Sequence, residues 1–231
     1  MSRGFGIVEQ KIEESEFFLS KLEETIDDSF FSDESQYYLS AFASATRSIT
    51  FTIQASISDI SGFKEWYEPQ QQKLKNSKLA RYFLEARNLS QKIGYYLIGG
   101  GSSYIDKEGI KRRYYYFQTF SDDTLSYVPE DDVLSCCKKY LSLLLEVVSD
   151  CYKTFGREID PELFFTYENL VYSKKTIEDF EDQAGYPRGW TAIPGFTVKD
   201  RIDLIGRHQP KPRIDWIFKK YLETDRYGKE V

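Results

Sequence analysis

Apolar residues recur every three or four positions along four long stretches of the chain, and polar residues fill most of the positions between them. This period is typical of amphipathic helices, which bury one face and leave the other in water. We therefore predict four long helices, over about residues 10–26, 37–54, 70–92 and 131–155. The fourth has the widest apolar stripe, so we expect it to be the most buried.

Special residues mark the ends of the third helix and one face of the second. Proline fits the first turn of a helix, so Pro69 is well placed to begin the third helix, and Gly94 is well placed to end it. On the second helix, small residues form a stripe beside the apolar one, at Ala41, Ala45 and Ser48. We expect another helix to approach closely there.

The pattern changes between about residues 95 and 128. YYLIGGGSSYI and RRYYYFQTF are rich in aromatic and β-branched residues, and the turn-like segment IDKEG separates them. We predict two or three strands here, packed on the helices as an insert. The three successive glycines, residues 99–101, are typical of a turn or bulge.

Beyond Gly156 the chain has only short helical patterns and a Gly/Pro-rich loop, GYPRGWTAIPG. The predicted fold class is mainly α: an antiparallel four-helix bundle with a small β insert and extra C-terminal short helices. We assign the bundle and its insert to residues 1–155. Residues 156–231 form a helical and loop extension that we expect to pack on the bundle.

The charge and hydropathy of the chain exclude some classes of function. The 231 residues carry a net charge of −6. This argues against a general nucleic-acid coat, because phosphate binding draws most of its affinity from Lys and Arg. A local basic cleft is compatible with that charge. No apolar run approaches the roughly 20 residues that cross a bilayer, and the N-terminus has no hydrophobic signal core, so we expect a cytoplasmic protein with no membrane partner.

The counts of histidine and cysteine exclude more chemistry. The chain has a single histidine, His208, in the polar stretch RHQPKPR, which predicts a surface turn. Zinc sites need several His or Cys ligands, and no Walker loop occurs, so we expect no metal and no cofactor. The three cysteines, at positions 136, 137 and 151, fall in the fourth predicted helix, where we expect buried, reduced thiols.

The end of the third predicted helix, FLEARNLSQKIG, is the strongest candidate for a functional site. Arg87 and Asn88 supply hydrogen-bond donors and Lys92 a second positive charge, and a guanidinium can hold two phosphate oxygens at once. On an ideal helix Arg87 and Gln91 share a face while Lys92 points elsewhere, so they converge only if the helix unwinds before Gly94. The alternative is structural: Arg87 pairs with a carboxylate, Lys92 is solvated and Asn88 braces the helix end.

Two further basic features have two interpretations each. Arg47 lies among apolar and hydroxyl residues of the second helix, where it either joins the cleft of Arg87 or forms a buried ion pair. The run KRR followed by YYYF, residues 111–117, resembles the mixture of basic and aromatic residues that stacks bases of single strands. A strand with alternating buried aromatic residues explains this run as well, and we favour that interpretation.

The order YYLSAFASATRSITFTIQ, then FKEWY, then YFLEARNLSQKIG resembles the HEPN superfamily of helical-bundle proteins, over roughly residues 10–155 with the strands as an insertion. In that superfamily an Arg-polar-(x)3-His motif closes the third helix. Arg87 and Asn88 match its first two positions, and Lys92 occupies the position of the histidine. The resemblance implies a homodimer in which two copies of the motif face one cleft. Many characterised relatives are metal-independent ribonucleases, often toxins.

The lysine changes the expected chemistry. Imidazole can accept a proton near pH 7, whereas an ordinary lysine, with a pKa of about 10.4, binds phosphate but does not act as a base. One hypothesis is therefore a homodimeric module that binds RNA or a nucleotide through Arg87, Asn88 and Lys92, assisted by Arg47 and Gln91, without efficient cleavage. The second is an active ribonuclease in which Arg87, Asn88 and Lys92 are catalytic. The third is a scaffold for a protein partner, and the missing histidine favours the first or the third.

Overall fold

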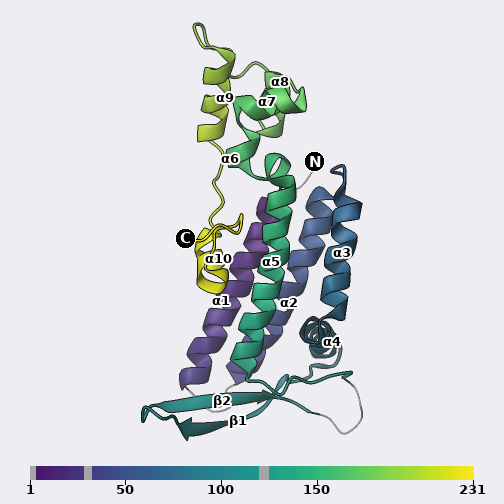
Figure 1. Cartoon of the computed structure of the whole chain (residues 1–231), viewed down its shortest axis with the longest axis vertical. Helices are drawn as coiled ribbons and strands as arrows, with labels where there is room; N and C mark the ends of the chain where they lie inside the picture. The colour runs from purple at the N-terminus through teal and green to yellow at the C-terminus, as the bar shows by residue number, and fades with distance from the viewer. Residues whose placement is uncertain (1–3, 29–32, 120–124) are drawn as a thin grey trace.

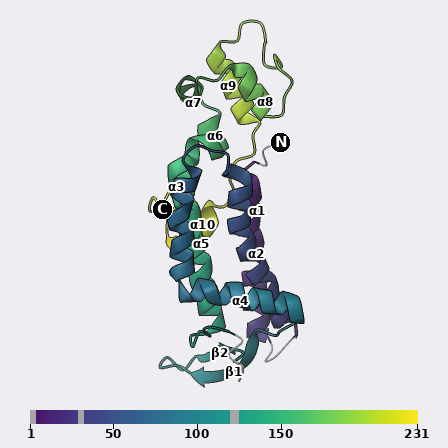
Figure 2. The same ribbon diagram turned by 90° about the vertical axis from the view of Figure 1, so that its right-hand side faces the viewer.

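The computed structural model describes residues 4–28, 33–119 and 125–231. Four helices run side by side along its longest axis, and consecutive ones are antiparallel (Figure 1): α1 (Gly6–Asp28), α2 (Asp33–Ile57), α3 (Phe63–Asn76) and α5 (Val133–Ile159). Helix α4 (Lys78–Ile93) lies across one end of this bundle (Figure 2). The predicted fold class is confirmed, since the chain is mainly helical with one small antiparallel sheet.

The prediction of one helix over residues 70–92 is wrong, because two helices cover this region. Helix α3 begins at Phe63, so Pro69 lies inside it rather than at its start. Its first turns are anchored by aromatic side chains: the Phe63 ring stacks on Tyr67, and Trp66 Nε1 donates a hydrogen bond of 2.7 Å to Asp150 of α5. These contacts fix the start of the helix earlier than the proline suggests.

The break between α3 and α4 is at Ser77. Its backbone is extended, and its side chain accepts a hydrogen bond of 3.2 Å from the backbone N–H of Ala80, which caps α4. Helix α4 then continues to Ile93, and Gly94, with φ of 65°, ends it as predicted. The change of direction at Ser77 is what turns α4 across the end of the bundle (Figure 2).

Helix α5 is the central helix of the fold. Its apolar residues are buried along its whole length, and it packs against α1, α2, α4, β2 (Lys111–Phe117) and α10 (Asp215–Leu222). All three cysteines lie on it as buried free thiols, as predicted. Burial raises the pKa of Cys136 to about 11, so this thiol is protonated at neutral pH.

A β-hairpin of β1 (Ile98–Ile105) and β2 covers the same end of the bundle as α4 (Figure 1). The glycine run does contain a bulge, between Ile98 and Gly100. Gly100 is paired with Tyr116 and Gly101 with Tyr115, and a Cβ at either glycine would meet the opposite ring. The glycines therefore make room for cross-strand aromatic rings.

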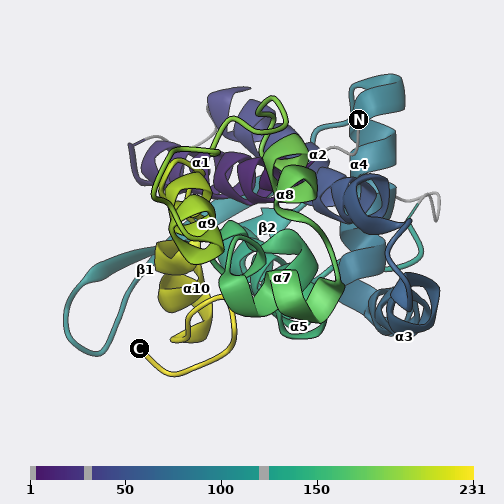
Figure 3. The same cartoon turned by 90° about the horizontal axis from the view of Figure 1, so that it is seen from above.

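The C-terminal third forms a small helical cap and then returns to the bundle. The cap consists of α6 (Pro161–Phe164), α7 (Tyr167–Ser173), α8 (Ile177–Gln183) and α9 (Val198–Arg207), and it has its own core around Phe180 (Figures 1 and 3). Helix α10 packs back on the bundle, where Ile217 and Phe218 are fully buried. The predicted domain boundary at residue 155 stays a prediction. No helix in the described ranges is both long and apolar enough to span a membrane.

A buried ion cluster fastens the C-terminal end to the junction of α5 and α6. Arg226 donates from Nε and Nη2 to Asp160 Oδ2 at 3.1 and 3.0 Å, and from Nη2 to Glu162 at 2.6 Å. It also pairs with Asp215, and the Tyr227 hydroxyl donates to Asp160. Asp160 is fully buried, so this carboxylate depends on these partners for its solvation.

We expect Arg226→Met to lower the free energy of unfolding by about 3–5 kcal/mol, because it leaves the buried Asp160 carboxylate without its cation. Urea denaturation followed by circular dichroism measures this. The control is Lys64→Met, which removes an exposed pair with Glu68 and should change stability by less than about 0.5 kcal/mol. Equal, small losses in the two variants would show that the cluster does not hold the C-terminal end.

Candidate anion-binding site at the crossing of α2 and α4

Serine side chains mark the point where α4 crosses α2. The hydroxyl oxygens of Ser40 and Ser90 lie 2.7 Å apart, and Gln91 Nε2 donates a hydrogen bond of 3.4 Å to Ser44 Oγ. These short side chains let the two helices approach closely, but they are not the predicted stripe of Ala41, Ala45 and Ser48. The crossing combines these hydroxyl and amide groups with an edge-to-face contact of Phe42 and Phe83, at 5.8 Å between ring centroids.

Arg47 lies one turn along α2 from Ser44 and is half-buried. Its guanidinium covers the Phe51 ring at 4.3 Å from the ring centroid, and Nη1 donates to Thr50 Oγ1 at 3.2 Å. Burial raises the pKa of Tyr140 on α5 to about 12, and the positive charge of Arg47 opposes part of that rise. Tyr140 stacks on Phe83 of α4 at 4.5 Å between centroids. Burial also raises the pKa of Tyr67 on α3, and the positive charge of Arg47 again opposes this rise, so Arg47 lies near both α3 and α5.

Arg87 lies on α4, one turn beyond Phe83 and one turn before Gln91, and it is also half-buried. Its Nη1 donates to Asn88 Oδ1 at 3.2 Å, while its Nε is buried without a hydrogen-bond partner. Among the described residues, no carboxylate lies within ion-pair distance of Arg87 or Arg47. The described residues therefore do not support the alternative in which either arginine forms a buried ion pair.

Few acidic residues lie near the two arginines in the sequence, and the nearest to Arg87, Glu85, accepts hydrogen bonds from Ser126. From residue 35 to residue 57, Arg47 is the only charged residue of α2, and residues 86–105 contain Arg87 and Lys92 but neither Asp nor Glu. In a chain with a net charge of −6, this gives the crossing a positive potential of its own. Such a surface favours an anionic ligand.

Lys92 does not join this group. Helix α4 stays helical to Ile93, so it does not unwind before Gly94, and Lys92 is exposed in its last turn. A lysine at that position favourably offsets the partial negative charge of the helix end. Gln91, by contrast, reaches α2. We name the remaining set the crossing patch: Ser40, Ser44, Arg47, Arg87, Asn88, Ser90 and Gln91.

Prediction from the sequence missed the three serines of the crossing patch. Ser40 and Ser44 precede Arg47 at helical spacing, and that periodicity was the available signal. Their pairing with α4 depends on the break at Ser77, which the prediction of a single helix over residues 70–92 did not include. The position of Ser90 one residue before Gln91 gives no signal of its own.

The other candidates lie elsewhere or have structural roles. His208 ends α9 in the cap, where its Nδ1 lies 2.9 Å from the carbonyl of Leu204, so it is remote from the crossing patch. In the hairpin, Tyr115 and Phe117 are buried and Tyr116 is exposed, which confirms the alternating aromatic strand. The described part of the chain contains no group of three or more His, Cys, Asp or Glu residues that could hold a metal ion.

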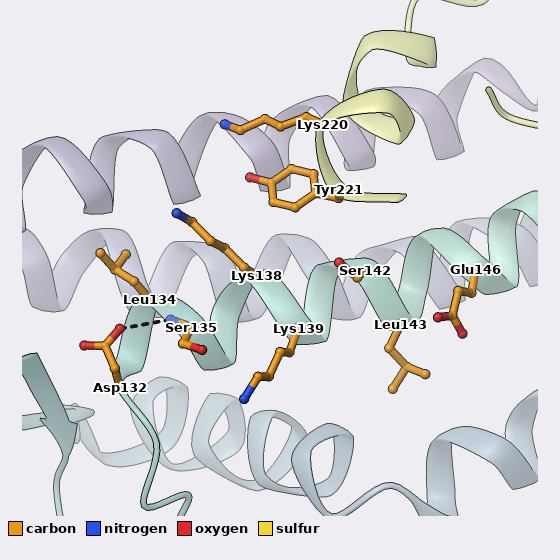
Figure 4. Close-up of a pocket in the computed structure, with 10 residues that line it drawn as sticks. All are labelled: Asp132, Leu134, Ser135, Lys138, Lys139, Ser142, Leu143, Glu146, Lys220 and Tyr221. Carbon is orange, nitrogen blue, oxygen red and sulfur yellow. Dashed lines mark hydrogen bonds between the residues drawn. The ribbon is translucent and has the colours of Figure 1, made fainter. Parts of the chain in front are cut away.

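A second basic region is a groove of about 770 Å³ along α5 (Figure 4). Three lysines line it, but Lys138 and Lys139 leave α5 on opposite sides (Figure 4). Each lysine pairs with a carboxylate at 2.6 Å: Lys138 with Glu23, Lys139 with Asp131, and Lys220 with Glu16. Because these charges are neutralised within the protein, the groove is a weaker candidate for an anion than the crossing patch.

Comparison with known families finds a match over the first part of the chain. The family model of bacteriophage lambda protein ea47 matches residues 8–98. The chain is similar to that family over this stretch. It runs from α1 to the start of β1 and includes the whole crossing patch. No curated protein and no solved structure matches the chain.

The HEPN resemblance is wrong. The match to the ea47 family covers the same segments that carried the resemblance, from YYLSAF to QKIG. Amphipathic helices with small residues on one face and an arginine near a helix end are common, so the order of such segments did not identify a superfamily. The homodimer and the catalytic roles of Arg87, Asn88 and Lys92 were implied by that resemblance and lose its support. The geometry of the crossing patch is independent of it.

The absence of carboxylate partners among the described residues leads to a prediction about stability. We expect Arg47→Met and Arg87→Met each to leave the free energy of unfolding unchanged, or to raise it by up to about 1 kcal/mol, because each replaces a half-buried unpaired charge with an apolar group of similar length. Urea denaturation tests this directly. A loss above about 2 kcal/mol in either variant would show that the arginine is a structural brace.

Proposed function

We propose that the crossing patch binds the phosphates of single-stranded RNA without cleaving the chain. The observation that carries this proposal is the placement of Arg47 and Arg87. On α2, Arg47 lies one turn from Ser44, and on α4, Arg87 lies one turn from Gln91, which is hydrogen-bonded to Ser44. Two half-buried guanidiniums from different helices therefore flank this contact, without a carboxylate partner among the described residues. A phosphate group supplies the negative charge that this arrangement lacks.

The chemistry of the two side chains fits phosphate. A guanidinium has five N–H donors in a planar fork. Among the described residues, Arg47 and Arg87 each donate one hydrogen bond to another protein group. The remaining donors can contact two phosphate oxygens at once, and partial burial strengthens such charge-assisted bonds. The hydroxyls of Ser40, Ser44 and Ser90 add neutral donors beside them.

Exposed aromatic residues at both ends of the patch favour a single strand over an isolated phosphate. Along α2, Tyr37, Ser40, Ser44, Arg47 and Phe51 follow one another at helical spacing, and the outer two are 59% and 49% exposed. Proteins that bind single strands combine cations along the backbone with aromatic rings on which bases stack. The α2 stripe has both components.

The proposal involves binding only, because the crossing patch contains no residue suited to act as a base near pH 7. Its members are serines, arginines and amides, and the neighbouring Lys92 is exposed. The match to the ea47 family adds no ligand, since its description names only a phage protein. The homodimer is not part of the proposal.

The test is fluorescence anisotropy with a labelled single-stranded RNA of mixed sequence, in EDTA. We expect Arg47→Ala and Arg87→Ala each to weaken binding at least about 10-fold, because each removes charge-assisted hydrogen bonds of about 1.5–3 kcal/mol. Phe51→Ala should also weaken binding, because one stacked base contributes about 1–3 kcal/mol. The matched control is Arg81→Ala, an exposed arginine at the start of the same helix.

Salt dependence separates phosphate contacts from other effects. For single strands, the slope of log affinity against log salt is about −0.7 per phosphate contact, so the double variant of Arg47 and Arg87 should flatten it by about 1.4. Equal losses for Arg81→Ala, or an unchanged slope, would contradict the assignment of the patch. RNA cleavage that disappears in Arg87→Ala would replace the binding function with a ribonuclease.

A further inference from the structure

A cavity of about 690 Å³ lies at the opposite end of the bundle from the crossing patch. It is formed where α1 begins, α2 and α5 end and the cap begins (Figure 1). The segment between α9 and α10, residues 209–213, closes another side. A cavity of this size matches the pockets that hold small organic ligands, about 300–1,000 Å³.

The cavity combines an apolar floor with carboxylates on one wall. The apolar lining comes from Phe5, Ile57, Ile60, Ile159, Phe164 and Phe165. Glu9 and Glu13 of α1 line the wall one turn apart, and Glu158 of α5 joins them. Like charges at this spacing on a helix repel each other, and the apolar surroundings make that repulsion stronger than in water.

Glu9 is the most constrained of these carboxylates. Its Oε1 accepts a hydrogen bond of 2.7 Å from the Tyr152 hydroxyl. Burial raises the pKa of Glu9; the Tyr152 hydrogen bond opposes this rise, and the negative charges of Asp160 and Glu13 add to it. The positive charge of nearby Arg226 lowers the pKa of Glu9, but not enough to cancel the rise. The ionised form of Glu9 is therefore only partly stabilised by its surroundings.

Two further observations show that the polar groups of the cavity are not satisfied by one another. The Ser56 hydroxyl lines the cavity and is buried without a hydrogen-bond partner. The basic side chains of the lining are Lys175, Lys211 and Arg213; Lys211 pairs with Glu162 at 3.3 Å, and Lys175 lies 4.9 Å from the centre of the Phe164 ring. In the described ranges, no ion pair joins a basic side chain to Glu9, Glu13 or Glu158.

We infer that this cavity binds a small organic cation, an amine with an aromatic or aliphatic body. Its ammonium group contacts the carboxylates of Glu9 and Glu13, and its apolar body packs on the phenylalanine and isoleucine floor. The Ser56 hydroxyl gains a polar partner. This ligand relieves the repulsion between the two carboxylates, whereas an anion would increase it and a neutral molecule would leave it unchanged.

Aromatic rings near the carboxylates support the same class of ligand. An ammonium group is attracted to the face of an aromatic ring, and the exposed Lys175 already lies over the ring of Phe164. A metal ion is a poorer fit, because no group of three or more suitable side chains in the described part of the chain could hold one. The site is separate from the crossing patch and does not depend on RNA binding.

The test uses three ligands that share an indole ring and differ only in charge: tryptamine, indole-3-ethanol and indole-3-acetate. Isothermal titration calorimetry of the full chain at pH 7.5 measures their affinities. We expect tryptamine to bind at least about 10-fold more tightly than the alcohol, and the alcohol more tightly than the acid. Ile60→Trp, which fills the cavity, should weaken the binding of all three.

Two variants locate the ammonium group. Glu13→Gln and Glu9→Gln should each weaken tryptamine binding about 10-fold with little effect on the alcohol, because each removes one charge and keeps the shape. If Glu9→Gln fails to fold, Glu13→Gln still tests the inference, because Glu13 makes no hydrogen bond to another protein group in the described part of the chain. The control is Glu24→Gln, an exposed residue of α1 that pairs with Lys21.

Three results would overturn the inference. The first is indole-3-acetate binding as tightly as tryptamine, which would mean that the basic side chains of the lining set the specificity. The second is an equal loss in Glu13→Gln and Glu24→Gln, which would place the ammonium group elsewhere. The third is the absence of tryptamine binding by folded protein at about millimolar concentration, a Kd beyond which no specific site is indicated.

Discussion

The packing of α5 in the centre of the bundle determines where the functional side chains lie. This helix buries residues along its whole length, so α1, α2, α4, β2 and α10 must all cover it. One of these contacts, the stacking of Tyr140 on Phe83, holds α4 across the end of the bundle. Arg87 follows Phe83 by one turn, and Arg47 lies within electrostatic reach of Tyr140. The crossing patch is thus a consequence of how the core is closed.

The fully buried charged side chains of the described residues have partners of opposite charge, unlike the two half-buried arginines of the crossing patch. Asp160 is fully buried and bonded to Arg226, and Glu181 is fully buried and accepts hydrogen bonds from Thr191 and Arg201. These pairs fasten the C-terminal end and the cap loop. By contrast, the arginines of the crossing patch contact hydroxyl groups, an amide and an aromatic ring. Unpaired charge of this kind costs stability, which is a reason to look for a ligand there.

Much of the fold could be predicted from the sequence, because the helices bury one face and their apolar period shows it. The fourth helix, the hairpin and the end of α4 at Gly94 are examples. The break at Ser77 was missed, since Leu74, Leu79 and Phe83 continue an apolar pattern across it while the signal for the break is a single serine cap. Local periodicity cannot show that the chain changes direction.

The candidate site was only partly predictable for the same reason. Arg87 and Gln91 share a face of any regular helix, so their proximity follows from spacing alone. The contacts of Gln91 with Ser44 and of Ser90 with Ser40 depend on the crossing of α4 over α2, which the break at Ser77 sets. The roles inferred from a family resemblance failed because they rested on the order of helical segments rather than on a geometry that the residues themselves define.

The most direct test of the account is an NMR titration that observes the arginine Nε–Hε groups while single-stranded RNA is added. Arg87 Nε is buried and has no partner within the protein, so its resonance should report a ligand at the crossing patch sensitively. The account predicts that the Arg47 and Arg87 signals shift in a saturable way while that of Arg81 stays in place. Unchanged Arg47 and Arg87 signals, with RNA bound and other arginines shifting, would contradict it.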